Sequence, residues 1–241
     1  MPLVEFHDVS YEVGGRQILS EVNFTVEAGE TLVLLGRSGS GKTTALKMTN
    51  GMLFPTSGQV LVEGRATTEW DPIRLKRHIG YVIQEVGLFP HFTVAENVGL
   101  VPTLEGWPAA DITQRVERLL GDMGLPPAEY LRRYPRQLSG GQRQRVGVAR
   151  ALAADPPLLL FDEPFGALDP VTRVELQRQF LDLRRDLRKT SIFVTHDVRE
   201  ALRLGTRIGL LARGRLEVAA DPQEFRNART EEALAFLSSL D

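Results

Sequence analysis

The sequence contains no cysteine, no excess of either charge and no long hydrophobic run. Without cysteine there are neither disulfides nor thiolate metal sites, which fits a reducing compartment. Lys and Arg total 29 against 31 Asp and Glu, a formal net charge of −2, so no broad basic field is expected for nucleic acid or anionic lipid. No apolar stretch has the length of a membrane span, and the N-terminus lacks the basic start and apolar run of a signal peptide. We therefore expect a cytoplasmic chain that reaches a membrane only through a protein partner.

The composition that remains is that of a globular α/β protein. The 241 residues are 42% hydrophobic and 25% charged, which is enough for one domain with a sizeable core. Residues 4–13 and 18–26 alternate apolar and polar side chains around Gly14-Gly15, a pattern that predicts an antiparallel hairpin. Residues 31–35 form a continuous apolar run, typical of a strand buried on both faces of a parallel sheet, and a helix over 42–50 is expected to follow.

Further buried strands are predicted over 79–83, 158–161, 191–194 and 208–211, with a long helical pattern over 171–187. Between residues 86 and 154 the strand signals vanish, and 111–123 and 141–153 carry the apolar spacing of helices. After residue 218 only two short pieces remain, 222–225 and 231–240. The pattern indicates a core of about residues 1–85 and 155–241 with a helical subdomain over about 86–154.

The segment Gly36-Arg-Ser-Gly-Ser-Gly-Lys-Thr-Thr44 fits G-x-x-x-x-G-K-[ST], the phosphate-binding P-loop. Its backbone N–H groups and the following helix N-terminus form an anion site. Lys42 is expected to bridge toward the γ-phosphate, and the Thr43 hydroxyl to ligate Mg²⁺. The phosphate-binding residues predicted here are Gly36, Ser38, Gly39, Ser40, Gly41, Lys42, Thr43 and Thr44.

Asp162 ends a predicted buried strand and is followed by Glu163. An ionised carboxylate there is costly unless it faces a cation, so Mg²⁺ is its natural partner, held directly or through water. A second segment, Ser139-Gly140-Gly141-Gln142, opens a predicted helix and points N–H groups and a hydroxyl at an anion. A P-loop by itself indicates only that the protein binds nucleotide. The P-loop, the Ser139–Gln142 segment and the strand ending at Asp162, in this order along the chain, narrow the class of nucleotide-binding protein further.

Together these motifs resemble those of the ATP-binding cassette (ABC) ATPases, over about residues 4–218. The resemblance implies an α/β P-loop NTPase with a mainly parallel core sheet, an N-terminal antiparallel β subdomain and a helical subdomain insert. It also implies that Glu163 is the general base on the attacking water, a role that typically contributes about 10²–10⁴-fold in rate. In the family, Ser139–Gln142 would contact ATP bound to another subunit, so that two cassettes form two composite sites.

Three further residues take their roles from this resemblance. Gln84 matches the glutamine that contacts Mg²⁺ and the attacking water, the alternative being a surface glutamine. His196 matches the histidine that reaches the γ-phosphate, the alternative being a capped loop histidine. Asp169 matches a loop that crosses to the second subunit, and it is also placed to cap a helix opening at Pro170, so both roles can hold together.

The adenine site departs from the family pattern. The family usually places an aromatic ring at the position of Val13, where valine stands here. Tyr11 lies two residues earlier on the same strand face and is an alternative stacking residue, although a hairpin or core tyrosine explains it equally well.

Residues 79–91 and 97–107 look like those of ATPases that serve quaternary-amine importers for glycine betaine, choline or carnitine. This resemblance implies ATP and Mg²⁺ as cofactors, a homodimer or paired ABC subunit, transmembrane permease subunits, an extracytoplasmic substrate-binding protein, and a position on the inner face of the cell membrane. It implies no nucleic-acid partner.

Other classes of function are less well matched. A soluble cassette ATPase acting on ribosomes or DNA would be expected to show tandem cassettes, a long coiled-coil insertion or a basic face. A P-loop phosphotransferase would have no use for Ser139–Gln142. An ATPase of an exporter or lipid transporter is the closest alternative.

Overall fold

The computed structural model describes residues 2–84, 87–166, 168–187 and 189–240. It divides into two compact units, one of residues 1–76 and 189–241 and one of residues 77–188. Residues 85 and 86, where the core and the helical subdomain were expected to meet, lie outside the described residues, as does position 167, two residues before Asp169.

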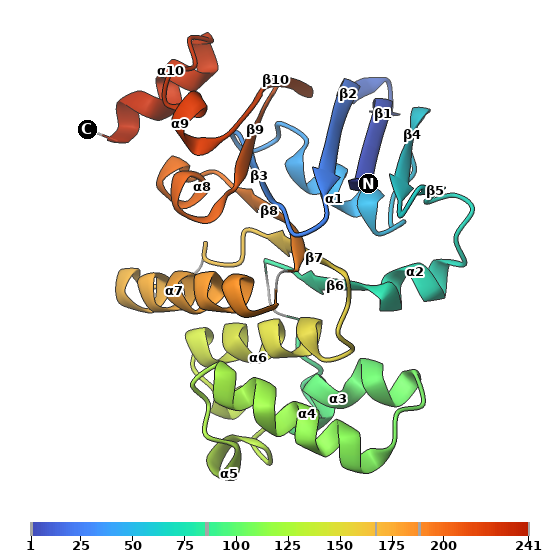
Figure 1. Ribbon diagram of the computed structural model, residues 1–241, viewed down its shortest axis with the longest axis vertical. Helices are drawn as coiled ribbons and strands as arrows, with labels where there is room; N and C mark the ends of the chain where they lie inside the picture. The colour runs from blue at the N-terminus through green and yellow to red at the C-terminus, as the bar shows by residue number, and fades with distance from the viewer. Residues whose placement is uncertain (1, 85–86, 167, 188, 241) are drawn as a thin grey trace. The chain divides into compact units, whose positions relative to one another are not determined.

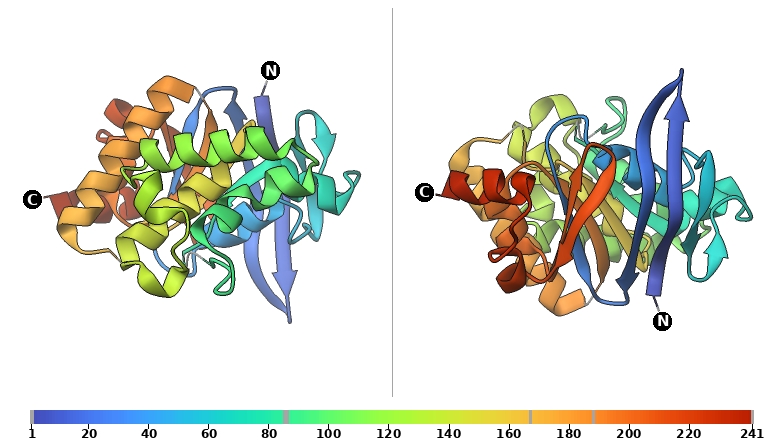
Figure 2. Two further views of the ribbon diagram at one scale, coloured as in Figure 1. Left: turned by 90° about the horizontal axis from the view of Figure 1, so that it is seen from below. Right: turned by 90° about the horizontal axis from the view of Figure 1, so that it is seen from above.

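The first unit contains an antiparallel sheet in the order β2-β1-β4-β5 (Figure 1). It is built from β1 (Pro2–Val13), β2 (Arg16–Glu27), β4 (Ser57–Val62) and β5 (Arg65–Ala66). The predicted hairpin is confirmed, since β1 and β2 pair antiparallel around Gly14 and Gly15, both with positive φ. The two long strands of this hairpin run side by side in Figure 2.

The same unit holds the strand run β10-β9-β3-β8, made of β3 (Thr31–Leu35), β8 (Thr190–Thr195), β9 (Arg207–Ala212) and β10 (Arg215–Ala220). β3 pairs in parallel with both β8 and β9, and every residue of β3 is buried, as its apolar run predicted. β10 was not predicted. It pairs antiparallel with β9 after the tight turn at Arg213 and Gly214, and its residues are only partly buried, so it lacks the apolar run of a central strand.

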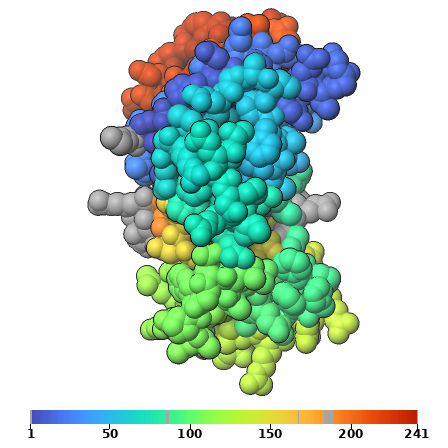
Figure 3. Space-filling model, turned by 90° about the vertical axis from the view of Figure 1, so that its right-hand side faces the viewer, coloured from blue at the N-terminus to red at the C-terminus, as the bar shows by residue number. Residues whose placement is uncertain are grey.

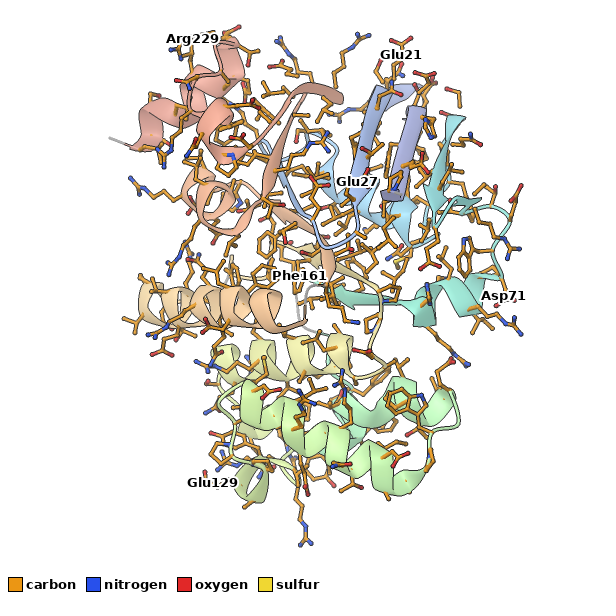
Figure 4. The ribbon with its side chains drawn as sticks, in the orientation of Figure 1. Glu21, Glu27, Asp71, Glu129, Phe161 and Arg229 are labelled. Carbon is orange, nitrogen blue, oxygen red and sulfur yellow. The ribbon has the colours of Figure 1, made fainter. Side chains whose placement is uncertain are left out.

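Short helices complete this unit: α1 (Lys42–Thr49), α8 (Val198–Leu204), α9 (Pro222–Phe225), α10 (Glu231–Leu237) and the 3₁₀ turn η2 (Ser238–Leu240). The boundary between the units falls inside α2 (Pro72–His78). Asp71, labelled in Figure 4, caps this helix by accepting hydrogen bonds from the N–H groups of Ile73 and Arg74 at 3.1 and 2.8 Å. Capping by an aspartate in this way satisfies N–H groups that the first turn leaves unpaired.

The second unit contains the parallel pair β6 (Ile79–Val82) and β7 (Leu158–Asp162), together with α3 (Val94–Leu104), α4 (Ala109–Asp122), α5 (Pro127–Tyr130), η1 (Pro135–Gln137), α6 (Gly140–Leu152) and α7 (Pro170–Leu187). The green surface in Figure 3 belongs to α3 and α4. Phe161 of β7 packs edge-to-face on Phe180 of α7, with ring centroids 5.0 Å apart (Figure 4). This contact anchors α7 over the strand that carries Asp162.

Helix α3 was missed by the sequence reading because Pro102 lies inside it, and proline usually ends a helix. A start signal was present nevertheless. Thr93 and Glu96 form a capping box, in which Thr93 Oγ1 accepts from the Glu96 N–H and the Glu96 carboxylate accepts from the Thr93 N–H. The expected fold class is confirmed. The N-terminal β-sheet is antiparallel, and strands pair in parallel around β3 and between β6 and β7. The described residues from 87 to 154 form helices and loops but no strand.

Candidate functional site

The P-loop joins the buried strand β3 to helix α1. Gly39 and Gly41 have φ of 78° and 105°, values that favour glycine strongly. Gly36 is required for a different reason, since a Cβ there would lie 2.2 Å from the carbonyl oxygen of Leu211 in β9. The loop therefore depends on glycine at three places, once through close packing and twice through backbone conformation.

Lys42 begins α1 and is only 4% exposed. Its Nζ donates hydrogen bonds to the carbonyl oxygens of Gly36 and Arg37, at 2.7 and 2.9 Å. The Oγ of Ser40 is buried and makes no hydrogen bond to any described residue. These features suit a phosphate group. Its oxygens can accept hydrogen bonds from the buried Ser40 hydroxyl, from the Lys42 ammonium and from the N–H groups of the helix N-terminus.

A cleft of about 340 Å³ opens beside this loop. It is lined by the loop from Arg37 to Ser40, by the end of β9, and by Glu231 and Glu232 of α10. Arg37 Nε donates to Glu232 Oε1 at 2.6 Å, which ties α10 to the P-loop. Sequence reasoning missed this pairing because the two residues lie far apart in the chain and no motif joins them.

His196 lies at the same sheet edge as the P-loop. In the parallel pair β3–β8, Leu35 is opposite Thr195, so Gly36 and His196 both follow the carboxyl ends of neighbouring strands. His196 is exposed, and Asp197 after it caps α8 by accepting from the Arg199 N–H at 2.8 Å. The carboxyl edge of parallel strands is where α/β folds bind ligands.

The β1–β2 hairpin borders the start of α1. A Cβ on Gly41 would lie 2.5 Å from Cδ2 of Leu19 in β2, and Tyr11 is the strand partner of Leu19. Tyr11 is half-buried, whereas Val13 is 56% exposed. Both residues therefore belong to the hairpin beside the P-loop, and the choice between them for the adenine ring remains a prediction.

The second unit brings Gln84, Asp162 and Glu163 to one edge. In the parallel pair β6–β7, Val82 is opposite Phe161, so Asp162 at the end of β7 and Gln84 and Glu163 just beyond the strands lie at the same carboxyl edge. Asp162 is 7% exposed, and Gln84 is exposed two residues beyond the end of β6. Glu163 has φ of 46°, a left-handed conformation that is uncommon for residues other than glycine and tends to cluster at functional sites.

Tyr81 is a residue of this edge that the sequence reading did not identify. Its phenol donates a hydrogen bond to Oδ2 of Asp162 at 3.3 Å. Burial raises the pKa of Tyr81 well above its usual value, and the neighbouring Asp162 carboxylate raises it further. The phenol therefore stays protonated and continues to donate to Asp162. The contact depends on the pairing of β6 with β7, so it could not be predicted from local sequence.

The segment Ser139–Gln142 is a helix N-terminus closed by a capping box. Ser139 Oγ accepts from the Gln142 N–H at 3.2 Å, and Gln142 Oε1 accepts from the Ser139 N–H at 2.9 Å. Gln142 Nε2 also donates to the Tyr130 hydroxyl at 2.9 Å. Helix α6 begins at Gly140, close to the predicted start, and Ser139 and Gly140 are exposed. The capped end is rigid, and the Ser139 hydroxyl proton is not used by the cap, since Ser139 Oγ acts there as an acceptor.

Asp169 caps α7, as its position before Pro170 predicted. Its Oδ1 accepts from the Thr172 N–H at 3.0 Å. The hydrogen bond from the Thr172 side chain, helped by the backbone N–H, holds the pKa of Asp169 below its usual value. The structural role of Asp169 is therefore established, and its role toward a second subunit remains a prediction.

The predicted site residues thus form two groups. The P-loop, His196, Tyr11 and Val13 belong to the first unit, whereas Gln84, Asp162, Glu163, Ser139–Gln142 and Asp169 belong to the second. Within each unit, the register of the parallel strand pair places the residues at the carboxyl ends of the two strands side by side.

Comparison with known proteins identifies relatives over most of the chain. Residues 19–166 match the family model described as ABC transporter. The chain is 52% identical to the osmoprotectant import ATP-binding protein OsmV of Salmonella typhimurium, over 86% of this chain and 54% of that protein. It is 48% identical to the glycine betaine/carnitine/choline transport ATP-binding protein OpuCA of Bacillus subtilis, over 90% of this chain and 57% of that protein. The chain therefore spans little more than half the length of these relatives.

A solved structure has the same fold. It is a dimeric, post-hydrolysis state of the ATP-binding cassette MJ0796 bound to ADP and Pi, with a TM-score of 0.81 and 33% sequence identity. The similarity covers 91% of this chain and 98% of that one.

Proposed function

We propose, from the premise that this chain belongs to the ABC transporter family, that it is the ATP-hydrolysing subunit of an importer. The observation that carries the proposal is the P-loop, whose glycine-dependent backbone, buried Lys42 and unpaired Ser40 hydroxyl suit the phosphates of ATP. The whole chain would act as one nucleotide-binding domain with a helical subdomain of about residues 86–154.

In this proposal the phosphates bind to Gly36, Ser38, Gly39, Ser40, Gly41, Lys42, Thr43 and Thr44. Thr43, Asp162 and Gln84 would hold Mg²⁺, which supplies charge neutralisation at the transferred phosphate. The buried position of Asp162 at a strand end supports this role, because a carboxylate there needs a cation or hydrogen-bond donors. Lys42 orients the phosphates through its ammonium group.

Glu163 would accept a proton from the attacking water, and His196 would contact the γ-phosphate. The strained backbone of Glu163 supports a positioned carboxylate, since such strain usually persists where function requires it. The exposed side chain of His196, at the same strand edge as the P-loop, supports a contact with bound nucleotide.

We propose further that ATP drives pairing of two such subunits. The exposed, capped segment Ser139–Gln142 would meet the ATP of the other subunit, and Asp169 would approach that subunit as well. The relative of known structure described as dimeric supports this assembly.

The partners would be transmembrane permease subunits on the inner face of the membrane and an extracytoplasmic substrate-binding protein. Among the described residues, no helix is both long and apolar enough to cross a bilayer, so any span would come from elsewhere. Relatives named for osmoprotectant, glycine betaine, carnitine and choline transport support a quaternary amine as the transported solute. We propose no nucleic-acid partner, in keeping with a net charge of −2 that provides no broad basic field.

The test of ATP hydrolysis is phosphate release by the purified chain over a series of protein concentrations, beside Lys42→Ala and Glu163→Gln. Activity that rises more than linearly with concentration and is lost in both variants is the expected result. Activity linear in concentration and unchanged in Glu163→Gln would remove both the assigned base and the paired sites.

Import is tested separately, by co-expressing the chain with its permease subunits and binding protein and measuring uptake of labelled choline and glycine betaine. Uptake that stops in Glu163→Gln supports the proposal. ATP-dependent release of solute from loaded vesicles, without uptake, would assign an exporter instead.

A further inference from the structure

One threonine contacts both segments that the proposed function directs at a second subunit. Thr172 lies in the first turn of α7, three residues after Asp169, and α7 packs beside α6 (Figure 1). Its methyl carbon Cγ2 lies 2.5 Å from the place where Gly141 would carry a Cβ. The methyl group therefore fills the space that any side chain at position 141 would need.

The two adjacent glycines of the segment differ in this respect. A Cβ on Gly140 would meet nothing closer than the Arg143 guanidinium at 4.0 Å. Gly140 thus faces open space, whereas Gly141 is backed by Thr172. Gly141 is also not required by its backbone, since its φ is not positive, so the contact with Thr172 is what excludes a side chain there.

The other groups of Thr172 hold Asp169. The backbone N–H donates to Asp169 Oδ1 at 3.0 Å, and the Thr172 side chain, acting as a hydrogen-bond donor, lowers the pKa of the same carboxylate. Threonine is stiff at χ1 because it is branched at Cβ. Once the hydroxyl is bound to Asp169, the direction of the methyl group is determined as well.

We propose that Thr172 is a positioning residue that couples Asp169 to Ser139–Gln142 within one subunit, so that the two segments reach the partner's nucleotide site in a fixed mutual arrangement. The proposal rests on the proposed function for its consequence, ATP-dependent pairing. The contact itself can be tested without it. If the Asp169 loop moved, the side chain of Thr172 would move with it and push on the backbone of Gly141.

The test uses two substitutions of Thr172, one of Gly141, and the double variant in which Thr172→Ser serves as the suppressor of Gly141→Ala. Thr172→Val keeps both branches of the side chain and the backbone N–H bond but loses the hydroxyl donor to Asp169, and Thr172→Ser keeps the hydroxyl but loses the methyl. Gly141→Ala adds the clashing Cβ, and in Gly141→Ala/Thr172→Ser that Cβ gains the space of the missing methyl. All are made in the Glu163→Gln chain, which under the proposed function would hold ATP without hydrolysing it.

Dimerisation in saturating ATP is measured by light scattering, ATP binding by fluorescent-nucleotide titration and stability by thermal unfolding. We expect Thr172→Val and Thr172→Ser each to weaken dimerisation several-fold while ATP binding and melting temperature stay unchanged. We expect Gly141→Ala to weaken it more, and Thr172→Ser to restore about fivefold or more of that loss, a coupling typical of residues in contact. Gly140→Ala, with no Thr172 contact, should gain nothing from Thr172→Ser.

Additive losses in Gly141→Ala/Thr172→Ser, or rescue of Gly140→Ala as well, would overturn the proposal. If the Glu163→Gln parent itself stays monomeric in ATP, the paired-site part of the proposed function fails instead. In that case the coupling between Gly141 and Thr172 is measured from the free energies of unfolding of Gly141→Ala, Thr172→Ser and the double variant. Additive changes in these free energies would overturn the proposed coupling.

Discussion

The phenol of Tyr81 donates a hydrogen bond to Asp162 Oδ2 across the β6–β7 pair, at 3.3 Å. A donor to a metal-binding carboxylate orients it, and loss of such a partner typically weakens metal affinity about 10–100-fold. Because this bond is long, we expect Tyr81→Phe to raise the Mg²⁺ concentration for half-maximal ATPase activity by about tenfold at most.

The raised pKa of Tyr81 sets the pH dependence of this effect. Burial, helped by the Asp162 carboxylate, raises the pKa of Tyr81 above the ordinary value of a phenol, so the hydroxyl stays protonated. The difference in Mg²⁺ requirement between Tyr81→Phe and the parent should therefore be constant across the neutral and mildly alkaline range. Magnesium titrations of ATPase activity at several pH values check this. Superimposable titrations of the two proteins would show that Tyr81 does not act on Asp162.

Lys42 is expected to act on nucleotide and not on the fold. Hydrogen bonds to the carbonyl oxygens of Gly36 and Arg37 hold its ammonium over the loop, and a hydrogen bond from that ammonium to a charged phosphate would contribute about 1.5–3 kcal/mol to nucleotide binding. Lys42→Ala should therefore weaken ATP binding about ten- to a hundredfold, measured by fluorescent-nucleotide titration. Lys47→Ala, in the last turn of the same helix, is the matched control and should bind ATP as the parent does.

We expect the carboxylate of Glu232 to lower the affinity of the P-loop for anions, because it lines the cleft and pairs with Arg37. It pairs with Arg37, which is 69% exposed, so the pair adds little stability. Glu232→Gln removes a negative charge from the cleft and releases Arg37 toward phosphate. We expect ATP to bind a few-fold more tightly at low salt, with the difference vanishing at high salt as screening grows. Calorimetric titrations at two ionic strengths measure it, and weaker binding at low salt would contradict it.

The hydroxyls of Thr31 and Ser191 hydrogen-bond at 2.9 Å in the buried β3–β8 pair. Thr31→Val leaves the Ser191 hydroxyl without this partner in the core, at a cost of about 1–3 kcal/mol. Thr31→Val/Ser191→Ala removes both groups and should recover most of that loss. Urea unfolding of the single and double variants checks this, and a double variant less stable than either single one would be contrary to expectation.

The capping box of α3 makes stability depend on pH. The hydrogen bond from the Thr93 backbone, with that from its hydroxyl, holds the pKa of Glu96 below the unfolded value of 4.5. A lowered folded pKa means that the stabilisation is complete above 4.5 and is lost as the pH falls through the folded pKa. The melting-temperature difference between parent and Glu96→Gln should therefore be constant at neutral pH and shrink in acid. A difference that grows in acid would argue against it.

Much of the fold follows from local sequence patterns. The apolar runs of β3, β7, β8 and β9 predicted buried strands within a residue or two of their observed ends. The sequence Gly36–Thr44 contains its own glycines and helix start, so the loop could be predicted without its neighbours. β4 and β10 were missed because they are only partly buried and carry no sustained apolar run.

By itself, then, the sequence predicted which segments would bind phosphate, and it determined which strand carries Asp162 and where the capped helices after Ser139 and Asp169 begin. Each of these depends on residues within a few positions of one another, whose backbone conformations and hydrogen bonds are local. Only the tertiary structure decided that Leu211 excludes a side chain at Gly36, that Tyr81 donates to Asp162, and that Thr172 fills the space beside Gly141. These contacts join residues far apart in the chain. Strand register and helix packing bring the residues into contact, and no local sequence pattern specifies either of them.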